Sequence, residues 1–460
     1  MSRRVLVVGL DCAPPALCFD RLARAMPALS ALRRRGAWGA LRSTVPPITV
    51  PAWACMVSGR DPGELGLYGF RKRVPGSYEL VTGDARDVQV PRVWDVLGEA
   101  GKKVCVLYVP PTSPPSAVRG QLVSCFLTPS PDAPCTHPPE LAAALEARFG
   151  PHAPDVGELR HGDEERLLDE LYASARQHFG VARALWAEER PDFLMMVEMG
   201  TDRLHHAMWT HLDPAHPAHD PSHPLVREAR DYYAFLDAQL ASLAELAGDD
   251  TAVLVVSDHG ARRTKGAICV NEHLRRTGWL ALREEPAAPT PLRIDDVDWS
   301  RTRAWAEAGY YARVFVNVRG REPQGIVPPE ELDETVEALR AELEALSSEG
   351  GEVIEVRAHR PAELYRAVRG HPPELLVFFG DLDYRALSLV GTRSIVVDGD
   401  DRRPDGANHD WDGIFVAAGA GVSARGELAG LSIFDVGPTI LSLMGVAVPD
   451  GWLGRDRSAG

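Results

Sequence analysis

The sequence predicts an α/β protein with a mostly parallel central sheet and helices on both faces. Short apolar runs rich in β-branched residues recur along the chain, at 5–10, 103–109, 193–199, 252–258, 374–379 and 413–418. Amphipathic helical patterns separate many of these runs, for example at 93–102, 167–190 and 228–246. Apolar strands that alternate with helices form parallel sheets that are buried on both faces. Ligands of such sheets bind beyond the carboxyl ends of the strands.

Two regions depart from this alternation. Residues 129–165 are rich in Pro, His and Asp and contain one short helical patch, which is typical of a surface excursion. Residues 281–399 carry strands of their own and a strongly periodic helix at 329–348. We therefore expect a core formed by 1–280 and 400–460, with 281–399 as an inserted smaller subdomain that shapes the site.

The composition and net charge of the chain disfavour some classes of binding partner. The hydrophobic content of 45% and charged content of 25% are ordinary for a globular protein. The formal charge of −15, from 50 basic and 65 acidic side chains, disfavours a nucleic-acid polymer or an anionic membrane surface as partner. A small phosphorylated ligand remains compatible, because a bound metal ion can reverse the local field.

The cysteines and the first residues predict a cytoplasmic protein. The seven cysteines are odd in number and form no CxxC pair, and several lie inside apolar runs, as Cys105 does. Buried thiols in a reducing compartment are the simplest interpretation. The apolar run near the start ends at Asp11, too early for a signal peptide, and no apolar stretch approaches the ~20 residues that span a bilayer. The oligomeric state stays open.

Acidic and imidazole side chains follow three of the predicted strands. Asp11 comes directly after the run at 5–10, Asp202 follows the run at 193–199, and Asp258 with His259 closes the run at 252–258. Because parallel strands end at one edge of a sheet, these groups are expected at that edge.

Two more histidines extend this set. His206 lies four residues after Asp202, which places both on one face of a helix, and His409 precedes another core strand. Three carboxylates and three imidazoles suit zinc or manganese. Each motif alone has a plainer explanation: a solvated surface pair, a helix cap or a loop histidine.

The stretch STVPPITVPAWACMVSGRDPGELG, residues 43–66, places a threonine between prolines ahead of an apolar run. Prolines 46, 47 and 51 prevent an ordinary strand there, and glycines interrupt the residues after the apolar run. Two interpretations are open: the segment is an irregular loop that serves packing only, or it presents Thr49 as a nucleophile at the start of a helix. An ionised Thr49 would add an oxygen ligand to the predicted metal site.

Together these motifs resemble the alkaline phosphatase superfamily, in particular its type I phosphodiesterase/nucleotide pyrophosphatase-like branch. The matching stretches are VVGLDCAPP, TVPAWACMVSGRDPGELGLYGF, EMGTDRLHHAMW, SDHG, GANHDWDGIFVAAGAGV and the closing LAGLSIFDVGPTILSLMGVAVPDGWLGR. They cover roughly 1–130, 180–280 and 400–456, and their shared order makes the resemblance specific. The resemblance implies an alkaline phosphatase-like catalytic core.

The resemblance also implies two divalent metal ions, zinc first and manganese second. One ion would be held by Asp202, His206 and His409, and the other by Asp11, Asp258 and His259 with the Thr49 oxygen beside it. Thr49 would attack phosphorus and form a phosphothreonine intermediate, which the start of a helix favours because it attracts anions. The two ions would clamp the attacking and leaving oxygens.

The net charge of the predicted metal site indicates which substrate charge it favours. Three aspartates and a threonine alkoxide carry −4 against +4 from two divalent ions, so a diester monoanion needs less help from further cations than a phosphate dianion does. Arg262, Arg263 and Lys265 follow the SDHG motif and are candidate phosphate contacts, or else ordinary solvated loop charges. The asparagine that comes after the nucleophile in the family is absent here, where Ala52 stands; Asn271 is a candidate replacement by position only. The predicted function is a phosphodiesterase or pyrophosphatase acting on a small soluble phosphorylated compound.

Four alternatives remain beside this function. A metal-dependent phosphomutase usually presents serine and carries an early insertion, and a phosphomonoesterase shares the superfamily. A sulfatase needs CxPxR or SxPxR, which is missing around Thr49. A non-catalytic metal-dependent binding protein would not need all seven positions filled by competent residues. Further histidines form either a second metal cluster or loop histidines interrupted by proline: His205, His211, His216, His219 and His223.

Overall fold

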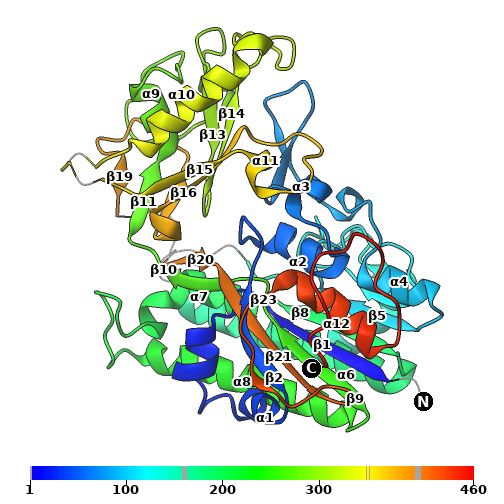
Figure 1. Cartoon of the computed structure of the whole chain (residues 1–460). Helices are drawn as coiled ribbons and strands as arrows, with labels where there is room; N and C mark the ends of the chain where they lie inside the picture. The colour runs from blue at the N-terminus through cyan, green and yellow to red at the C-terminus, as the bar shows by residue number, and fades with distance from the viewer. Residues whose placement is uncertain (1–2, 158–162, 349, 352, 399–405, 460) are drawn as a thin grey trace. The chain divides into compact units, whose positions relative to one another are not determined.

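The computed structural model describes residues 3–157, 163–348, 350–351, 353–398 and 406–459. The chain forms two compact units (Figure 1). Unit 1 comprises Met1–Leu65, Gly83–Ala261 and Arg402–Gly460, and unit 2 comprises Gly66–Thr82 and Arg262–Asp401. Within the described ranges, no helix combines the length and apolar character needed to span a membrane.

A ten-stranded sheet forms the centre of unit 1, in the order β22-β2-β21-β9-β1-β8-β5-β6-β7 with β23 beside β2. Its strands are β1 (Arg4–Leu10), β2 (Ala37–Arg42), β5 (Val104–Leu107), β6 (Gly120–Val123), β7 (Thr136–His137), β8 (Phe193–Glu198), β9 (Thr251–Val256), β21 (Asp412–Gly419), β22 (Gly426–Glu427) and β23 (Leu431–Ser432). The consecutive strands β9, β1, β8, β5 and β6 are parallel. Antiparallel partners flank them, β21 at β9 and β7 at β6. The predicted α/β class with a largely parallel central sheet is confirmed.

Alternate residues of β1 supply two hydrophobic cores, one on each face of this sheet. Leu6, Val8 and Leu10 join one core, and Val5 and Val7 join the other. The first core is covered by α1 (Pro27–Arg35), α5 (Leu141–Phe149), α6 (Glu164–Glu189), α7 (Gly200–Leu212) and α8 (Pro224–Ala247). The second is covered by α2 (Thr49–Ser58), α4 (Val93–Glu99) and α12 (Val436–Leu443). The short α3 (Pro62–Leu65) comes after α2.

Unit 2 is built on a second, mainly antiparallel sheet of seven strands, in the order β13-β14-β16-β17-β11-β19 with β15 beside β16. The strands are β11 (Gly266–Cys269), β13 (Ala304–Glu307), β14 (Ala312–Val316), β15 (Val356–His359), β16 (Leu375–Phe379), β17 (Tyr384–Leu387) and β19 (Val396–Val397). Its helices are α9 (Val270–Arg276), α10 (Leu332–Glu344) and α11 (Pro361–Leu364). Two small ribbons complete it, β3 (Arg71–Arg73) with β4 (Leu80–Thr82) and β12 (Thr290–Pro291) with β18 (Leu389–Val390).

The division of the chain differs from the boundaries expected from sequence. The long segment of unit 2 begins at Arg262 rather than at 281, because β11 pairs with β17 and β19. Unit 2 also includes residues 66–82, whose side chains bond within unit 2: the Tyr78 hydroxyl donates to Asn317 Oδ1 at 2.9 Å. The described part of 129–165 belongs to unit 1, where β7 extends the sheet edge and Leu145 of α5 packs into the first core. Residues 158–162 of that region lie outside the described ranges.

Candidate metal centre

Three adjacent parallel strands of unit 1 deliver acidic side chains to one edge of the sheet. Asp11 comes directly after β1, and Asp258 comes after β9, which pairs with β1 on one side. On the other side of β1, β8 leads into α7, which carries Asp202 and His206 in its first turns. The seven predicted side chains are all buried, none more than 4% exposed: Asp11, Thr49, Asp202, His206, Asp258, His259 and His409.

The atoms of these side chains form two groups with the spacing of metal ligands. Asp202 Oδ1 lies 3.2 Å from His206 Nε2 and 3.6 Å from His409 Nε2. A tetrahedral ion with bonds of about 2.1 Å holds its ligand atoms roughly 3.4 Å apart. Each imidazole of the first predicted set therefore lies at a ligand-like distance from Asp202.

The second group is centred on His259. Its Nε2 lies 3.1 Å from Asp258 Oδ2, 3.7 Å from Asp11 Oδ1 and 3.3 Å from the Thr49 hydroxyl. The rings of His259 and His409 stack with their centroids 3.8 Å apart, so the two groups adjoin. The structure thus brings all seven predicted side chains together.

Hydrogen bonds orient two of the imidazoles for ligation. His409 Nδ1 donates to the Pro47 carbonyl at 2.9 Å, and His259 Nδ1 donates to the Gly260 carbonyl at 3.0 Å. Because a carbonyl only accepts, Nδ1 carries the proton in each ring and Nε2 keeps its lone pair. This is the arrangement by which metal-binding histidines are held in place.

The buried carboxylates of the cluster favour a bound cation. Burial, followed by repulsion from a neighbouring aspartate, raises the pKa of both Asp11 and Asp258 well above the ordinary value. Within the described part of the chain, Asp11 Oδ1 and Asp258 Oδ2 accept no hydrogen bond. Burial also opposes ionisation of Asp202, but His206 and His409 outweigh it and hold the pKa of Asp202 well below the usual range. Buried oxygens without donors fit divalent cations.

The proline-rich segment places Thr49 at the first residue of α2. Ile48 precedes it in an extended conformation, with φ −142° and ψ 136°. Pro51 lies within the first turn, where the missing N–H has no intrahelical partner to lose. At the other end Gly59 terminates the helix with φ +62°. Thr49 therefore lies among the free N–H groups of a helix start, which attract anions.

Two residues beside the cluster were not identified from the sequence. Trp53 Nε1 donates to Asp11 Oδ2 at 2.6 Å, and Arg203 Nη1 donates to Asp202 Oδ2 at 2.7 Å. Arg203 also bonds both carboxylate oxygens of Asp155. The spacing of four between Thr49 and Trp53, one turn of helix, was the available signal for Trp53.

Replacing Trp53 by phenylalanine is expected to weaken zinc binding by about 10- to 100-fold, because Asp11 loses the donor that orients it. Competition with a chromophoric chelator measures this affinity. Trp94→Phe is the matched control: Trp94 lies in the same core, and its Nε1 has no hydrogen-bond partner within the described residues. Equal affinities in the two variants would contradict the assigned role of Trp53.

The predicted substrate contacts lie in unit 2, where Arg262, Lys265 and Asn271 bond to structural partners. Arg262 Nη2 lies 3.3 Å from Asp383 Oδ1, and Lys265 Nζ lies 2.7 Å from Asp383 Oδ2. Asn271 bonds the backbone of Ala306 with both atoms of its amide, at 2.8 and 2.9 Å. Their contact with substrate stays a prediction.

Three of the additional histidines form hydrogen bonds that stabilise local structure. His205 Nε2 bonds the Tyr233 hydroxyl at 2.6 Å, His219 Nδ1 donates to the Thr210 carbonyl at 2.7 Å, and His223 caps α8. Among the described residues, two groups have ligand atoms that all lie within 4.8 Å of one another: Cys12, Asp202, His259 and His409 form one, and Asp11, Asp258 and His259 form the other. His206, 3.2 Å from Asp202, belongs to neither group. None of these additional histidines belongs to either group.

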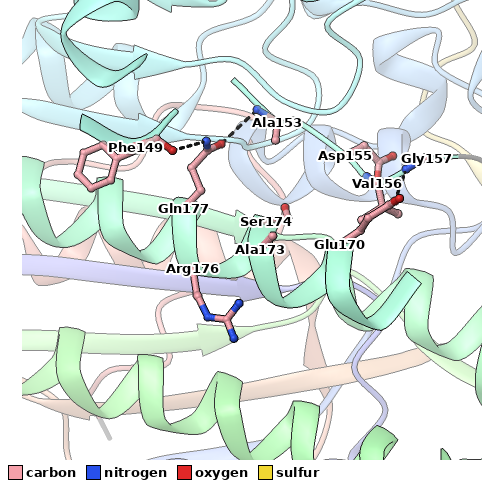
Figure 2. A pocket seen from close by; sticks show the side chains of 10 residues that line it. All are labelled: Phe149, Ala153, Asp155, Val156, Gly157, Glu170, Ala173, Ser174, Arg176 and Gln177. Carbon is pink, nitrogen blue, oxygen red and sulfur yellow. Dashed lines mark hydrogen bonds between the residues drawn. The ribbon is translucent and has the colours of Figure 1, made fainter. Parts of the chain in front are cut away.

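Figure 2 shows a separate hollow on unit 1, with a volume of about 590 Å³, along one side of α6. Gln177 bonds the Phe149 carbonyl and the Ala153 N–H at its edge, and Glu170 bonds the Gly157 N–H. None of the seven cluster residues lines it. The hollow is therefore not part of the candidate metal centre.

Comparison with known proteins identifies the family. Residues 5–404 match the family described as Type I phosphodiesterase / nucleotide pyrophosphatase. A comparison with curated proteins finds no match. Among solved structures, phosphonoacetate hydrolase from Sinorhizobium meliloti 1021 in complex with phosphonoacetate is similar, with a TM-score of 0.59 and 16% identity over 97% of this chain and 96% of that chain.

Two mammalian structures share the fold as well. Human ectonucleotide pyrophosphatase/phosphodiesterase 5 has a TM-score of 0.56 and 11% identity, over 97% of this chain and 96% of that chain. An inactive threonine-to-alanine variant of the murine protein, in complex with AMP, has a TM-score of 0.56 and 12% identity, over 99% and 97%. With its metal-competent cluster at the sheet edge, the chain is a metal-dependent phosphoryl hydrolase and belongs to the type I phosphodiesterase/nucleotide pyrophosphatase family of the alkaline phosphatase superfamily.

Proposed function

We propose that this protein is a two-metal phosphodiesterase or pyrophosphatase that acts on a small phosphorylated compound through a phosphothreonine intermediate at Thr49. One observation carries the proposal: the Thr49 hydroxyl, at the start of α2, lies 3.3 Å from His259 Nε2 inside a cluster of carboxylates and imidazoles. A threonine without a general base or a cation beside it is a poor nucleophile.

The two ligand groups have separate tasks. Asp202, His206 and His409 would hold one ion, and Asp11, Asp258 and His259 the other. When bound, the ions supply positive charge that lowers the pKa of a hydroxyl or water and stabilises the oxygens of the transferred phosphoryl group. The ligand-like separations and the buried oxygens without donors support this division.

The chain's own residues would perform a double displacement. Thr49 Oγ1 attacks phosphorus; the Oγ1–P bond forms while the bond from phosphorus to the leaving oxygen breaks. The N–H groups at the start of α2 bind the phosphoryl oxygens in this step. Water then attacks the phosphothreonine, breaks the Oγ1–P bond and returns the Thr49 hydroxyl.

The charge of the cluster supports diesters and pyrophosphates as substrates. Asp11, Asp202 and Asp258 with an ionised Thr49 balance two divalent ions, −4 against +4, and Arg203 is already bound to Asp202 and Asp155. A substrate with a single negative charge at the reacting phosphorus suits a neutral site. Phosphonoacetate and AMP, named with similar structures, belong in the substrate panel beside the diesters.

A substrate panel with an intermediate trap tests this function. Purified protein loaded with zinc or manganese is assayed on bis-p-nitrophenyl phosphate, p-nitrophenyl phosphate, a dinucleotide pyrophosphate, AMP and phosphonoacetate. The expected result is preferred turnover of the diester or pyrophosphate, with an acid-quenched enzyme that carries one phosphoryl group on the Thr49 peptide. Turnover without any phosphorylated Thr49 would exclude the intermediate, and preference for the monoester would exclude the substrate class.

Metal binding is expected to release protons at pH values above the ordinary pKa of aspartate. The raised pKa of Asp11 and of Asp258 means that the metal-free site retains protons above the ordinary aspartate value of 3.8, and a metal ion must displace them. Zinc affinity therefore rises as the pH rises through the raised values. Calorimetry in two buffers of different ionisation enthalpy measures the protons released. Identical binding heats in both buffers would contradict the prediction.

A further inference from the structure

We propose that Cys12 is a protein ligand of the ion held by Asp202, His206 and His409, so that this position binds its metal through sulfur as well as nitrogen and oxygen. The inference rests on the proposed two-metal site and adds a donor that neither the sequence motifs nor the family comparison supplied.

The position of the thiol carries this inference. Cys12 Sγ and ligand atoms of Asp202, His259 and His409 all lie within 4.8 Å of one another, and all four residues are buried. His259 Nε2 lies 3.1 Å from Asp258 and 3.7 Å from Asp11, which assigns it to the other ion. Sulfur then joins Asp202 and His409, two proposed ligands of the first ion, while Thr49 lies beside His259 in the other set.

The residues around Cys12 support the presence of one cation in each ligand set. Asp11 Oδ1 is fully buried and accepts no hydrogen bond within the described residues, so a cation in the neighbouring set would satisfy it. The Cys12 backbone N–H donates to Asp258 Oδ1 at 3.1 Å, which fixes the residue between the two sets. The thiol itself donates to the Gly260 carbonyl at 3.3 Å. Ligation would break the S–H bond, release that proton to solvent and form the sulfur–metal bond.

The backbone conformation of Cys12 supports a functional role for its side chain. Its φ is +62°, in the left-handed region where glycine is the unstrained choice. A side chain kept in such a conformation marks a candidate functional position. Because glycine adopts a positive φ without strain, Cys12→Gly removes the sulfur and leaves the backbone conformation accessible.

A thiolate would change the metal preference of the site. Soft sulfur ligands select zinc and cobalt over manganese and magnesium. It would also add one negative charge, giving −5 against +4 from the two ions. The added charge disfavours a dianionic phosphate further and is consistent with a diester or pyrophosphate substrate.

Cobalt(II) spectroscopy of the full-length protein tests the proposal. The metal-free protein is titrated with Co²⁺ alone, and absorption is followed in the visible range, for ligand-field bands, and in the near ultraviolet, for sulfur-to-cobalt charge transfer. The wild type and Cys18→Ala are expected to show both kinds of band. Cys18 is a buried thiol of the first core, outside the cluster, and serves as the matched control. Cys12→Gly is expected to keep ligand-field bands and to lose the charge-transfer band completely.

The outcomes separate this inference from the proposed function. Two equivalents of bound cobalt without charge transfer in the wild type would overturn the role of Cys12 and leave the two-metal site standing. Charge transfer that persists in folded Cys12→Gly would overturn it as well. Failure of the wild type to bind cobalt at all would overturn both proposals. Far-ultraviolet circular dichroism verifies that each variant is folded.

Discussion

Thr49→Ala is expected to reduce the turnover of a phosphodiester by at least about 10³-fold, because it removes the oxygen proposed to attack phosphorus in the first step. The change deletes one hydroxyl and leaves the six acids and imidazoles in place, so metal content should remain at the wild-type value. Steady-state kinetics on bis-p-nitrophenyl phosphate, with elemental analysis of the same preparation, measures both quantities.

Thr49→Ser provides the control for this change. Serine keeps the nucleophilic oxygen and loses a methyl group, so its activity should lie far closer to that of the wild type than the alanine variant does. Turnover by Thr49→Ala at the wild-type rate, with two metal ions bound, would mean that water attacks phosphorus directly. The double displacement through Thr49 would then be wrong.

Removal of divalent ions is expected to abolish activity and to lower the free energy of unfolding. Metal-free protein keeps three buried carboxylates within one cluster, two of which have oxygens without hydrogen-bond donors in the described residues. Each ion present at 100 times its dissociation constant adds about 2.7 kcal/mol to stability, or about 5 kcal/mol for two independent sites. Denaturant unfolding with and without zinc measures the increment.

Two aspartate variants make this test specific. Asp258→Asn should lose much of the zinc-dependent increment, because it removes a carboxylate from the second ligand group. Asp237→Asn is the matched control: Asp237 is equally buried but accepts hydrogen bonds from the Ala28 and Leu29 N–H groups, outside the cluster. It should lose stability and yet retain the full increment. Equal increments in both variants would contradict the ligand assignment.

The order of strands and the acids at their ends could be predicted because both depend on local patterns. Nearly continuous apolar runs mark buried parallel strands, and the residues that end them reach one edge. Asp11, Asp258 and Asp202 were found in this way, and they lie beyond the neighbouring strands β1, β9 and β8. Thr49 could be located because prolines and glycines mark its irregular segment.

Other features depend on long-range contacts that no local pattern reports. Residues 66–82 belong to unit 2 because Tyr78 bonds Asn317, 239 positions away in the sequence. Cys12 looked like an ordinary core thiol, since its positive φ and its proximity to His409 arise only when the strand ends meet. Trp53 lies in the second core, and its hydrogen bond to Asp11 depends on how α2 packs against β1.

The position of unit 2 in the chain has a consequence for engineering. His259 and His409 lie just outside the long segment of unit 2, and their rings stack, while β10 (Gly260–Arg263) pairs with β20 (Ala407–Asp410). Both ends of the long segment of unit 2 are thus close in sequence to a proposed metal ligand. Because every side chain of the proposed metal centre lies in unit 1, the two unit 2 segments, Gly66–Thr82 and Arg262–Asp401, could be exchanged together for a different module while the ligand-bearing strands stay unchanged.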